Sequence, residues 1–374
     1  MSKGLYIHIP YCKRKCSYCA LPSIENPSLI GIDEYIAALL REAQSRADCS
    51  RFSSLFIGGG TPSLLSAEQL KTLFSGILSS YSLEPDAEVS IELNPDTVDS
   101  ELIEGLANSP VNRISLGAQS FDGAECLFLG RLHDPEHTRT VLGSLRAASF
   151  DNISLDLIAG FPGHSIESWR KTLDEACALE PEHIALYLYQ REEGSKLDGE
   201  IRRAALQEVE EDEQADMYYW AKDYLERRGY GQYEISNFAR PGYYCRHNVN
   251  YWLGGEYLGL GAAASSHEGG ARYSNVVDPH RYIEIARDGG RLLADWEKLP
   301  KEAKWRENLM LRLRMLSPVE LRELSPHPGE DVLTSVRQDL RDCRDQGLLE
   351  ELGSSFLLSS KGLILANEVL ARVI

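Results

Sequence analysis

The sequence lacks any long apolar run: no stretch approaches the roughly 18 apolar residues of a membrane-spanning helix. Basic residues are scarce as well, with 39 Lys and Arg against 57 Asp and Glu, a formal net charge of -18. This balance argues against a general nucleic-acid-binding surface, which needs a basic stripe. No apolar signal segment precedes the first expected strand, so we expect a reducing, cytoplasmic location rather than a set of disulfides.

The composition is that of an ordinary globular protein, with 43% hydrophobic and 26% charged residues. A chain of 374 residues is too long for one small core, so we expect a large barrel-type domain and a smaller one. The pattern of elements places the large domain at 1–235, a connecting segment at 236–295 and a C-terminal domain at 296–374.

Three cysteines near the start of the chain, Cys12, Cys16 and Cys19, form a C-x3-C-x2-C pattern. Three thiolates can hold three irons of a [4Fe-4S] cluster, whereas a structural zinc site needs four ligands. The alternative is a zinc site completed by His8 or a distant cysteine, but no second C-x2-C or H-x3-H follows at the usual spacing. With Tyr18 just before the third cysteine, the motif resembles the radical S-adenosylmethionine (SAM) superfamily. That resemblance implies that the open iron binds SAM.

Short apolar segments alternate with amphipathic stretches, which predicts parallel strands joined by crossover helices. The strands are expected at 4–9, 54–58, 88–93, 113–118, 153–158 and 183–189. The helices are expected at 33–46, 66–80, 99–107, 135–149, 165–179 and 207–228. A doubly wound open sheet is the alternative architecture. Unusual residues follow or lie in every strand, however, which favours an α/β partial (β/α)6 TIM-like barrel of radical SAM type.

Each candidate residue also has a plain structural explanation. Three consecutive glycines at 58–60 form either a tight turn or a loop that lets backbone approach a ligand. Asp156 lies between apolar strand residues and is costly to bury without a partner, so a ribose diol or an arginine is expected beside it. Taken alone, Glu92 is compatible with a solvated strand residue and Arg131 with a surface charge.

Together these motifs resemble the oxygen-independent coproporphyrinogen oxidase family. The segments that carry the resemblance include Gly58-Gly-Gly-Thr-Pro-Ser63, Leu116-Gly-Ala-Gln119, Leu129-Gly-Arg131-Leu-His133 and Asp156-Leu-Ile-Ala-Gly160-Phe-Pro-Gly163. The resemblance implies that Cys12, Cys16 and Cys19 hold the cluster. It also implies SAM contacts from Tyr6 and Tyr18 near the adenosine, Gly59, Gly60 and Thr61 near the amino group, Glu92 and Arg131 at the amino-acid end, and Gln119 and Asp156 at the ribose.

The second half resembles the heme chaperone branch of that family through Arg246-His247-Asn248-Val249-Asn250-Tyr251-Trp252. The resemblance implies heme as a ligand. His247 could supply an axial imidazole, Tyr251 and Trp252 an apolar wall, and Arg246 a propionate partner. A lone histidine more often has a structural role. Covalent attachment of heme through a residue such as Cys245 is a further alternative.

The chain departs from both branches. Only five residues precede Tyr6, where the oxidases carry a long extension, and Leu21 stands where they carry another cysteine. It also departs from the chaperone pattern, because Ala20 and Leu21 replace an Asp-Phe pair and His267 is displaced by two positions. No role is carried over to His267.

The C-terminal part is predicted to be a small α+β, winged-helix-like domain. Its expected elements are helices at 305–316 and 332–343 and a hairpin at 347–358. Many acidic residues lie among its arginines, so a lid over the barrel or a docking surface for a partner is favoured over DNA binding.

The resemblance therefore predicts a heme chaperone that carries a [4Fe-4S] cluster and SAM and passes heme to an acceptor protein. The alternatives are oxidative decarboxylation of coproporphyrinogen III and radical SAM chemistry on an unrelated substrate. We expect no nucleic-acid partner and no transmembrane segment, with peripheral contact to membrane proteins left open. The acidic composition is compatible with a monomer or a ligand-dependent dimer.

Overall fold

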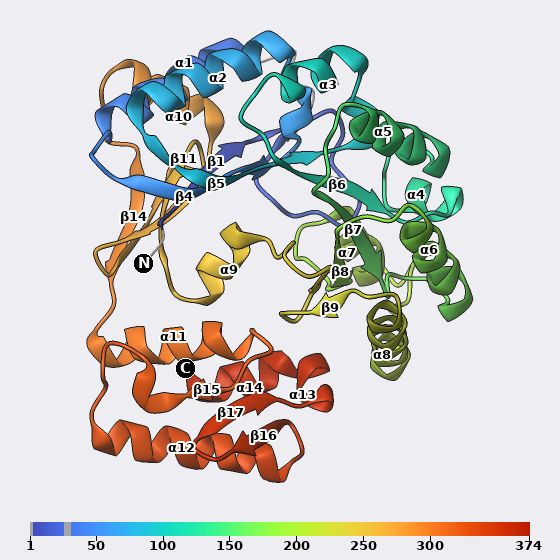
Figure 1. Cartoon of the computed structure of the whole chain (residues 1–374), viewed down its shortest axis with the longest axis vertical. Coiled ribbons are helices and arrows are strands. Elements are labelled where there is room, and N and C mark those ends of the chain that lie inside the picture. Colours follow the sequence, from blue (N-terminus) through green and yellow to red (C-terminus); the bar gives the residue numbers. More distant parts are fainter. Residues whose placement is uncertain (1–2, 26–30) are drawn as a thin grey trace.

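A run of six parallel strands forms the centre of the computed structural model, which describes residues 3–25 and 31–374 (Figure 1). In spatial order these strands are β1 (Lys3–Ile9), β4 (Arg51–Gly59), β5 (Ser82–Leu93), β6 (Arg113–Gln119), β7 (Ile153–Ala159) and β8 (His183–Leu188). All six predicted strands are confirmed. β4 and β5 begin earlier than predicted because Arg51 and Phe52 pair with Ser82 and Leu83 before a register shift.

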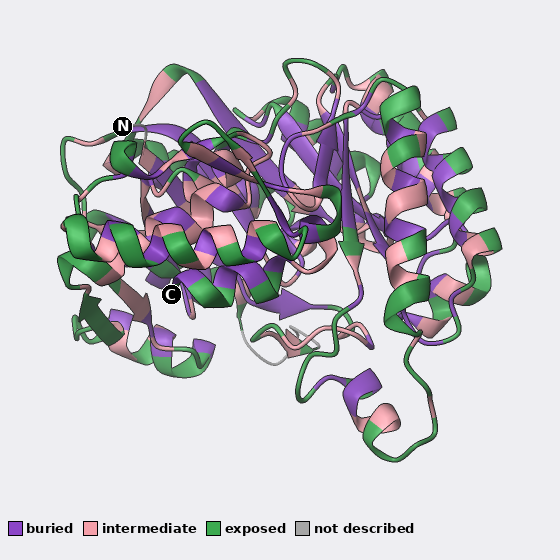
Figure 2. Cartoon of the chain, turned by 90° about the horizontal axis from the view of Figure 1, so that it is seen from below, coloured by how far each residue is buried: buried purple, intermediate pink, exposed green. Residues whose placement is uncertain are grey.

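Helices cover the outside of this sheet, and the six predicted crossover helices are present. They are α1 (Ile32–Ser45), α2 (Ala67–Ser80), α3 (Ser100–Ala107), α5 (Pro135–Ala147), α6 (Ile166–Ala178) and α8 (Glu211–Arg227). Ser66 begins α2 with a capping box to Gln69, and Asp134 accepts a hydrogen bond from the backbone of His137 at the start of α5. Two short helices, α4 (Gly123–Phe128) and α7 (Lys196–Arg202), were not predicted. Figure 2 shows the buried strands inside and the exposed helix faces outside.

The segment 236–295, expected to connect two domains, extends the sheet at both ends. On the β8 side, β10 (Asn237–Ala239) adds an antiparallel strand, which pairs in turn with β9 (Gly231–Gln232) from just before this segment. On the β1 side, β11 (Glu256–Leu260) pairs parallel to β1 and is followed by β12 (Ser265–Glu268), β13 (Ala271–Asn275) and β14 (Leu293–Lys298). Gly259 allows this packing, because a Cβ there would meet the carbonyl oxygen of Ser265 at 2.1 Å. Twelve of the described strands thus form one sheet that does not close on itself.

Two helices of the same segment lie against this sheet. α9 (Arg246–Trp252) lies between the parallel strands and the C-terminal domain in Figure 1, and α10 (Pro279–Arg287) packs on α1. α9 contacts the amino-terminal parts of β1 and β4, since His247 lies against Gly4 and Ser54. The helix therefore covers the end of the barrel opposite to the loops that follow the strands.

The C-terminal domain combines helices with a small antiparallel sheet, ordered β15 (Val319–Glu320), β17 (Ser355–Leu358), β16 (Leu349–Leu352). Its helices are α11 (Lys301–Leu313), α12 (Glu330–Asp345), α13 (Ser360–Ile364) and α14 (Ala366–Val373). Both helices and the hairpin predicted here are confirmed. Trp305 of α11 is fully buried and its indole nitrogen donates to the carbonyl oxygen of Leu321 at 3.4 Å. No helix among residues 3–25 and 31–374 is both long enough and apolar enough to cross a membrane.

Candidate functional site

The three cysteines lie on the loop that follows β1. Cys12 is buried in the short strand β2 (Tyr11–Cys12), which pairs with β3 (Ile24–Glu25), while Cys16 and Cys19 are half-buried. Two backbone hydrogen bonds fix the loop: Ser17 donates to the carbonyl of Leu129 at 2.9 Å, and its own carbonyl accepts from Leu197 at 2.9 Å. The chain thus holds the three thiols at the carboxyl end of the first barrel strand, where a barrel carries its chemistry.

The environment of these thiols suits metal-bound sulfur. Burial raises the pKa of Cys12 and Cys19, and the neighbouring cysteines raise it further because negative charges would gather there. Bound iron would replace the protons and relieve this cost. Among the described residues, no three His, Cys, Asp or Glu side chains converge closely enough for a single metal ion.

Arg131 ties this loop to the barrel. Its Nη1 donates to the sulfur of Cys16 at 3.3 Å, and its Nη2 donates to Asn94 Oδ1 and to the carbonyl of Gly117, each at 2.7 Å. The side chain is buried, so it is a positive charge placed beside the sulfur of Cys16 rather than the surface charge that the isolated residue suggests.

Neighbouring glycines allow close backbone packing around the same loop. Gly130 has a φ of 81°, and a Cβ there would meet the backbone nitrogen of Ser17 at 2.9 Å. In the 58–60 segment, a Cβ on Gly59 would meet the ring of His8 at 2.7 Å, and one on Gly60 would meet the carbonyl oxygen of Tyr11 at 2.5 Å. Packing against β1 at Gly59 and against β2 at Gly60 therefore accounts for the missing side chains of these glycines.

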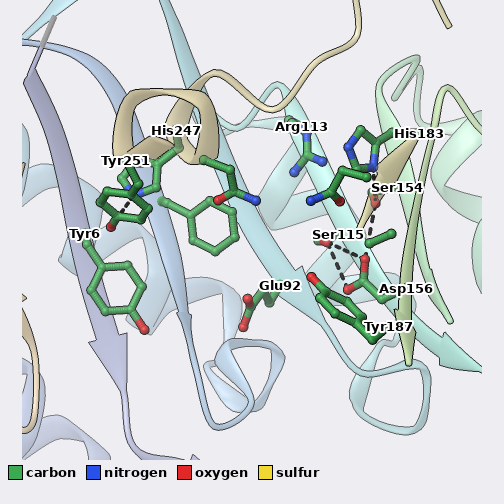
Figure 3. Close-up of a pocket in the computed structure, with 14 residues that line it drawn as sticks. Tyr6, Glu92, Arg113, Ser115, Ser154, Asp156, His183, Tyr187, His247 and Tyr251 are labelled. Carbon is green, nitrogen blue, oxygen red and sulfur yellow. Dashed lines mark hydrogen bonds between the residues drawn. The ribbon is translucent and has the colours of Figure 1, made fainter. Parts of the chain in front are cut away.

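The inward faces of the strands enclose a cavity of about 230 Å³, named here the barrel cavity (Figure 3). Three predicted SAM residues, Tyr6, Glu92 and Asp156, line it. Sequence reasoning missed several other lining residues, although they stand at alternate strand positions beside predicted ones: Arg113, Ser115, Ser154, His183 and Tyr187. The cavity is therefore polar on the β5 to β8 side.

Two carboxyl groups of this cavity, those of Glu92 and Asp156, have raised pKa values. Burial, followed by the charge of Asp156, raises the pKa of Glu92 to about 7, although the backbone N–H of Gly59 donates to its Oε2 at 3.1 Å. Burial raises the pKa of Asp156 to about 6, and the Ser115 hydroxyl lies 2.9 Å and 3.0 Å from its two oxygens. Both carboxyl groups thus keep their protons to a higher pH than usual, and a cation beside either one would favour its ionised form.

The remaining predicted SAM residues lie near the cysteine loop or above the cavity. Burial raises the pKa of Tyr18, next to Cys16 and Arg131. Thr61 is buried beside Cys12. Gln119 ends β6 with a φ of 67° and does not line the barrel cavity. The predicted SAM residues thus lie in two groups, one around the cysteine loop and one lining the barrel cavity.

His247 lies deep in the opposite end of the barrel. The side chain is 1% exposed, and both ring nitrogens are in hydrogen bonds, Nδ1 with the Ser54 hydroxyl and Nε2 with the Tyr251 hydroxyl, each at 2.8 Å. Burial lowers the pKa of His247 to about 3. In this arrangement neither nitrogen is free to bind iron.

Cys245 and Arg246, for which the sequence suggested contacts to heme, each have a partner within the protein. Arg246 points away from the barrel to pair with Asp86, with 3.3 Å between Nη1 and Oδ2. Cys245 is fully buried, and burial raises the pKa of its thiol to about 12, so it is not a reactive nucleophile here. Glu88 accepts hydrogen bonds from the backbone N–H groups of Arg246 and His247 and thereby fixes the start of α9.

Six parallel strands with three cysteines on the loop after the first strand define a radical SAM domain. Residues 6–176 match the Radical SAM superfamily, and residues 299–365 match the HemN C-terminal domain. Membership of that superfamily implies SAM and a [4Fe-4S] cluster.

Whole-chain relatives define the family more narrowly. The chain is 35% identical to the heme chaperone HemW of Lactococcus lactis over 98% of its own length and 96% of that protein. It is 32% identical to HemW of Escherichia coli K12, with 98% and 97% covered. The structure of coproporphyrinogen III oxidase HemN from Escherichia coli superimposes with a TM-score of 0.88 at 23% identity, covering 100% of this chain and 90% of that one, which shows the shared fold. The chain belongs to the HemW family.

Proposed function

We propose that this protein is a heme chaperone, which binds heme and transfers it to a heme-accepting protein. The observation that carries the proposal is similarity to heme chaperones over nearly the whole chain, C-terminal domain included. The proposal further includes a cytoplasmic location, a monomer or ligand-dependent dimer, and no nucleic-acid partner. It retains the domain limits 1–235, 236–295 and 296–374, and leaves room for peripheral contact with membrane proteins.

In this proposal Cys12, Cys16 and Cys19 hold a [4Fe-4S] cluster. The cluster supplies an open iron for the amino and carboxylate groups of SAM and a single electron. Arg131 donates a hydrogen bond to the sulfur of Cys16 and places a positive charge beside it. The backbone bonds of Ser17 keep the loop in place during cluster insertion.

The proposed SAM site runs from the cysteine loop into the barrel cavity, with Tyr6 and Tyr18 near the adenosine and Gly59, Gly60 and Thr61 near the amino group. Glu92 would face the ammonium group, because an ionised carboxylate buried next to Asp156 is stabilised by a cation. Asp156 would accept hydrogen bonds from the ribose hydroxyls, with Ser115 orienting its carboxylate. Arg131 would serve the carboxylate end and Gln119 the ribose.

The test is an anaerobic experiment on the cluster-loaded protein. We expect a hemin titration to give a saturable Soret band, and the loaded protein to pass heme to a b-type apocytochrome. A parallel incubation with SAM, dithionite and coproporphyrinogen III should give no protoporphyrinogen. Protoporphyrinogen formation without stoichiometric heme binding would overturn the chaperone proposal in favour of the oxidase.

A further inference from the structure

A second cavity, about 450 Å³ in volume, lies beside β11 and β12, in the part of the sheet that leads to its β14 edge, and is named here the edge cavity. It is about twice as large as the barrel cavity and falls in the usual range for sites of small organic ligands. The cysteine loop contributes Leu21 and Pro22, and α9 and α11 form other walls. Tyr6 and Tyr251 line both cavities, so one wall separates them.

His267 of β12 is the notable side chain of the edge cavity. It is 6% exposed, and its Nδ1 lies 3.2 Å from the carbonyl oxygen of Gly255. A carbonyl oxygen only accepts, so Nδ1 carries the proton and Nε2 of the neutral ring keeps its lone pair. No described residue provides a hydrogen-bond partner for that buried Nε2.

This tautomer is the one that metal-binding histidines adopt, with one nitrogen bonded to a backbone carbonyl and the other facing the metal. Burial lowers the pKa of His267, and nearby Lys304 and Arg272 lower it further, so the ring stays neutral near pH 7. His247 lacks this arrangement, because hydroxyl groups bond both of its nitrogens.

The charged groups of the edge cavity favour an anionic ligand. Arg272 and Lys304 both line it, and both pair with the same carboxylate, that of Glu307. Two cations against one carboxylate leave a net positive charge at this wall. A porphyrin with ionised propionates would balance that charge.

The other walls are largely apolar and aromatic. Trp252, Tyr257 and Leu311 line the cavity, and the ring of Tyr257 lies 6.0 Å from that of His267. Flat apolar side chains of this kind suit the faces of a macrocycle. The site therefore combines a neutral imidazole, an apolar wall and a cationic rim, the three features that a heme needs.

We propose that heme binds in the edge cavity, with its iron on Nε2 of His267 and its propionates toward Arg272 and Lys304. This inference rests on the proposed chaperone function and names the site where its cargo is held. His247 then has the structural role of fixing α9 against Ser54.

The test compares hemin binding by His267→Ala, His247→Ala and His280→Ala in the full-length, cluster-loaded protein. We expect His267→Ala to weaken affinity by about tenfold or more and to change the low-temperature electron paramagnetic resonance signal of the ferric heme. Added imidazole should restore the original signal by filling the space left by the ring. The exposed control His280→Ala should bind as the unaltered protein does, and His247→Ala should keep the position of the Soret band.

A second measurement does not depend on the histidine variant. Arg272→Gln should weaken binding of hemin but not of hemin dimethyl ester, because the ester has no charge for the guanidinium. An unaltered signal in His267→Ala, with the signal lost in His247→Ala, would overturn the inference while leaving the chaperone function intact. Equal effects of Arg272→Gln on hemin and its ester would also contradict it. Failure of the unaltered protein to bind hemin would instead defeat the proposed function itself.

Discussion

Replacing Glu92 by glutamine should stabilise the ligand-free protein above neutral pH. Burial, and then the charge of Asp156, raises the pKa of Glu92 from 4.5 to about 7. An acid with a higher pKa in the folded than in the unfolded state binds more protons when folded. Stability is therefore lost as the pH rises from 4.5 through about 7. The difference between these two values corresponds to about 3 kcal/mol at pH 8.

Calorimetric unfolding of the SAM-free protein at pH 8 and pH 5 tests this reasoning. Glu92→Gln should raise the Tm by roughly 5 °C at pH 8, since a chain of this size shifts by about 2 °C per kcal/mol. At pH 5 the gain should fall to roughly a quarter of that at pH 8, because the carboxyl group is then protonated in the folded state but still largely ionised in the unfolded state. Glu104→Gln, an exposed substitution on α3, is the matched control and should leave the Tm within about 1 °C.

The same variant should bind SAM more weakly, since glutamine offers no negative charge to the ammonium group. Isothermal titration would show this loss beside the gain in Tm. A Tm at pH 8 equal to or below that of the unaltered protein would refute the claim that the ionised carboxylate destabilises the empty cavity. Stability that is gained without any loss of SAM affinity would instead separate Glu92 from the ligand.

Three other changes have clear expected outcomes. Gly60→Ala should reduce the iron bound per chain, because its Cβ would collide with the carbonyl oxygen of Tyr11 and displace the cysteine loop; iron analysis checks this. Arg131→Met should shift the cluster midpoint potential to more negative values in anaerobic redox titration, since it removes a positive charge beside Cys16. Glu42→Ala should cost about 3 kcal/mol in urea unfolding, because the buried carboxylate joins several elements. Its partners are Arg46, Gly261, Asn275 and Tyr282.

The parallel core could be predicted because its pattern is local. Each strand, such as Ile153–Ala159, is a short apolar run, and each helix begins at a recognisable cap, as Ser165 does for α6. The pairing of β11 with β1 was missed because it joins residues 3–7 to 256–260, a contact that no short-range pattern encodes. Gly259 was the available signal, since a glycine inside a strand marks the close approach of another backbone.

The residues of the candidate site also fall into those that the sequence reveals and those that only the fold reveals. Cys12, Cys16 and Cys19 are recognisable because one loop carries all three, and Glu92 and Asp156 because polar residues interrupt apolar strands. The buried state of Arg131 was not predictable, since its partners are distant in the sequence: Asn94 lies just after β5 and Gly117 lies in β6.

The two histidines of the second half show why a motif and a site can differ. His247 stands in a recognisable motif, yet the fold places it between Ser54 and Tyr251, which occupy both nitrogens. His267 stands outside that motif, and its free Nε2 depends on a carbonyl twelve residues earlier and on α11 closing the cavity. Whether a histidine can bind a metal depends on what surrounds its second ring nitrogen, so only the folded structure distinguishes His267 from His247. A role in stability explains the motif equally well. His247 hydrogen-bonds both the Tyr251 hydroxyl within α9 and the Ser54 hydroxyl of β4, and these contacts hold the helix in place.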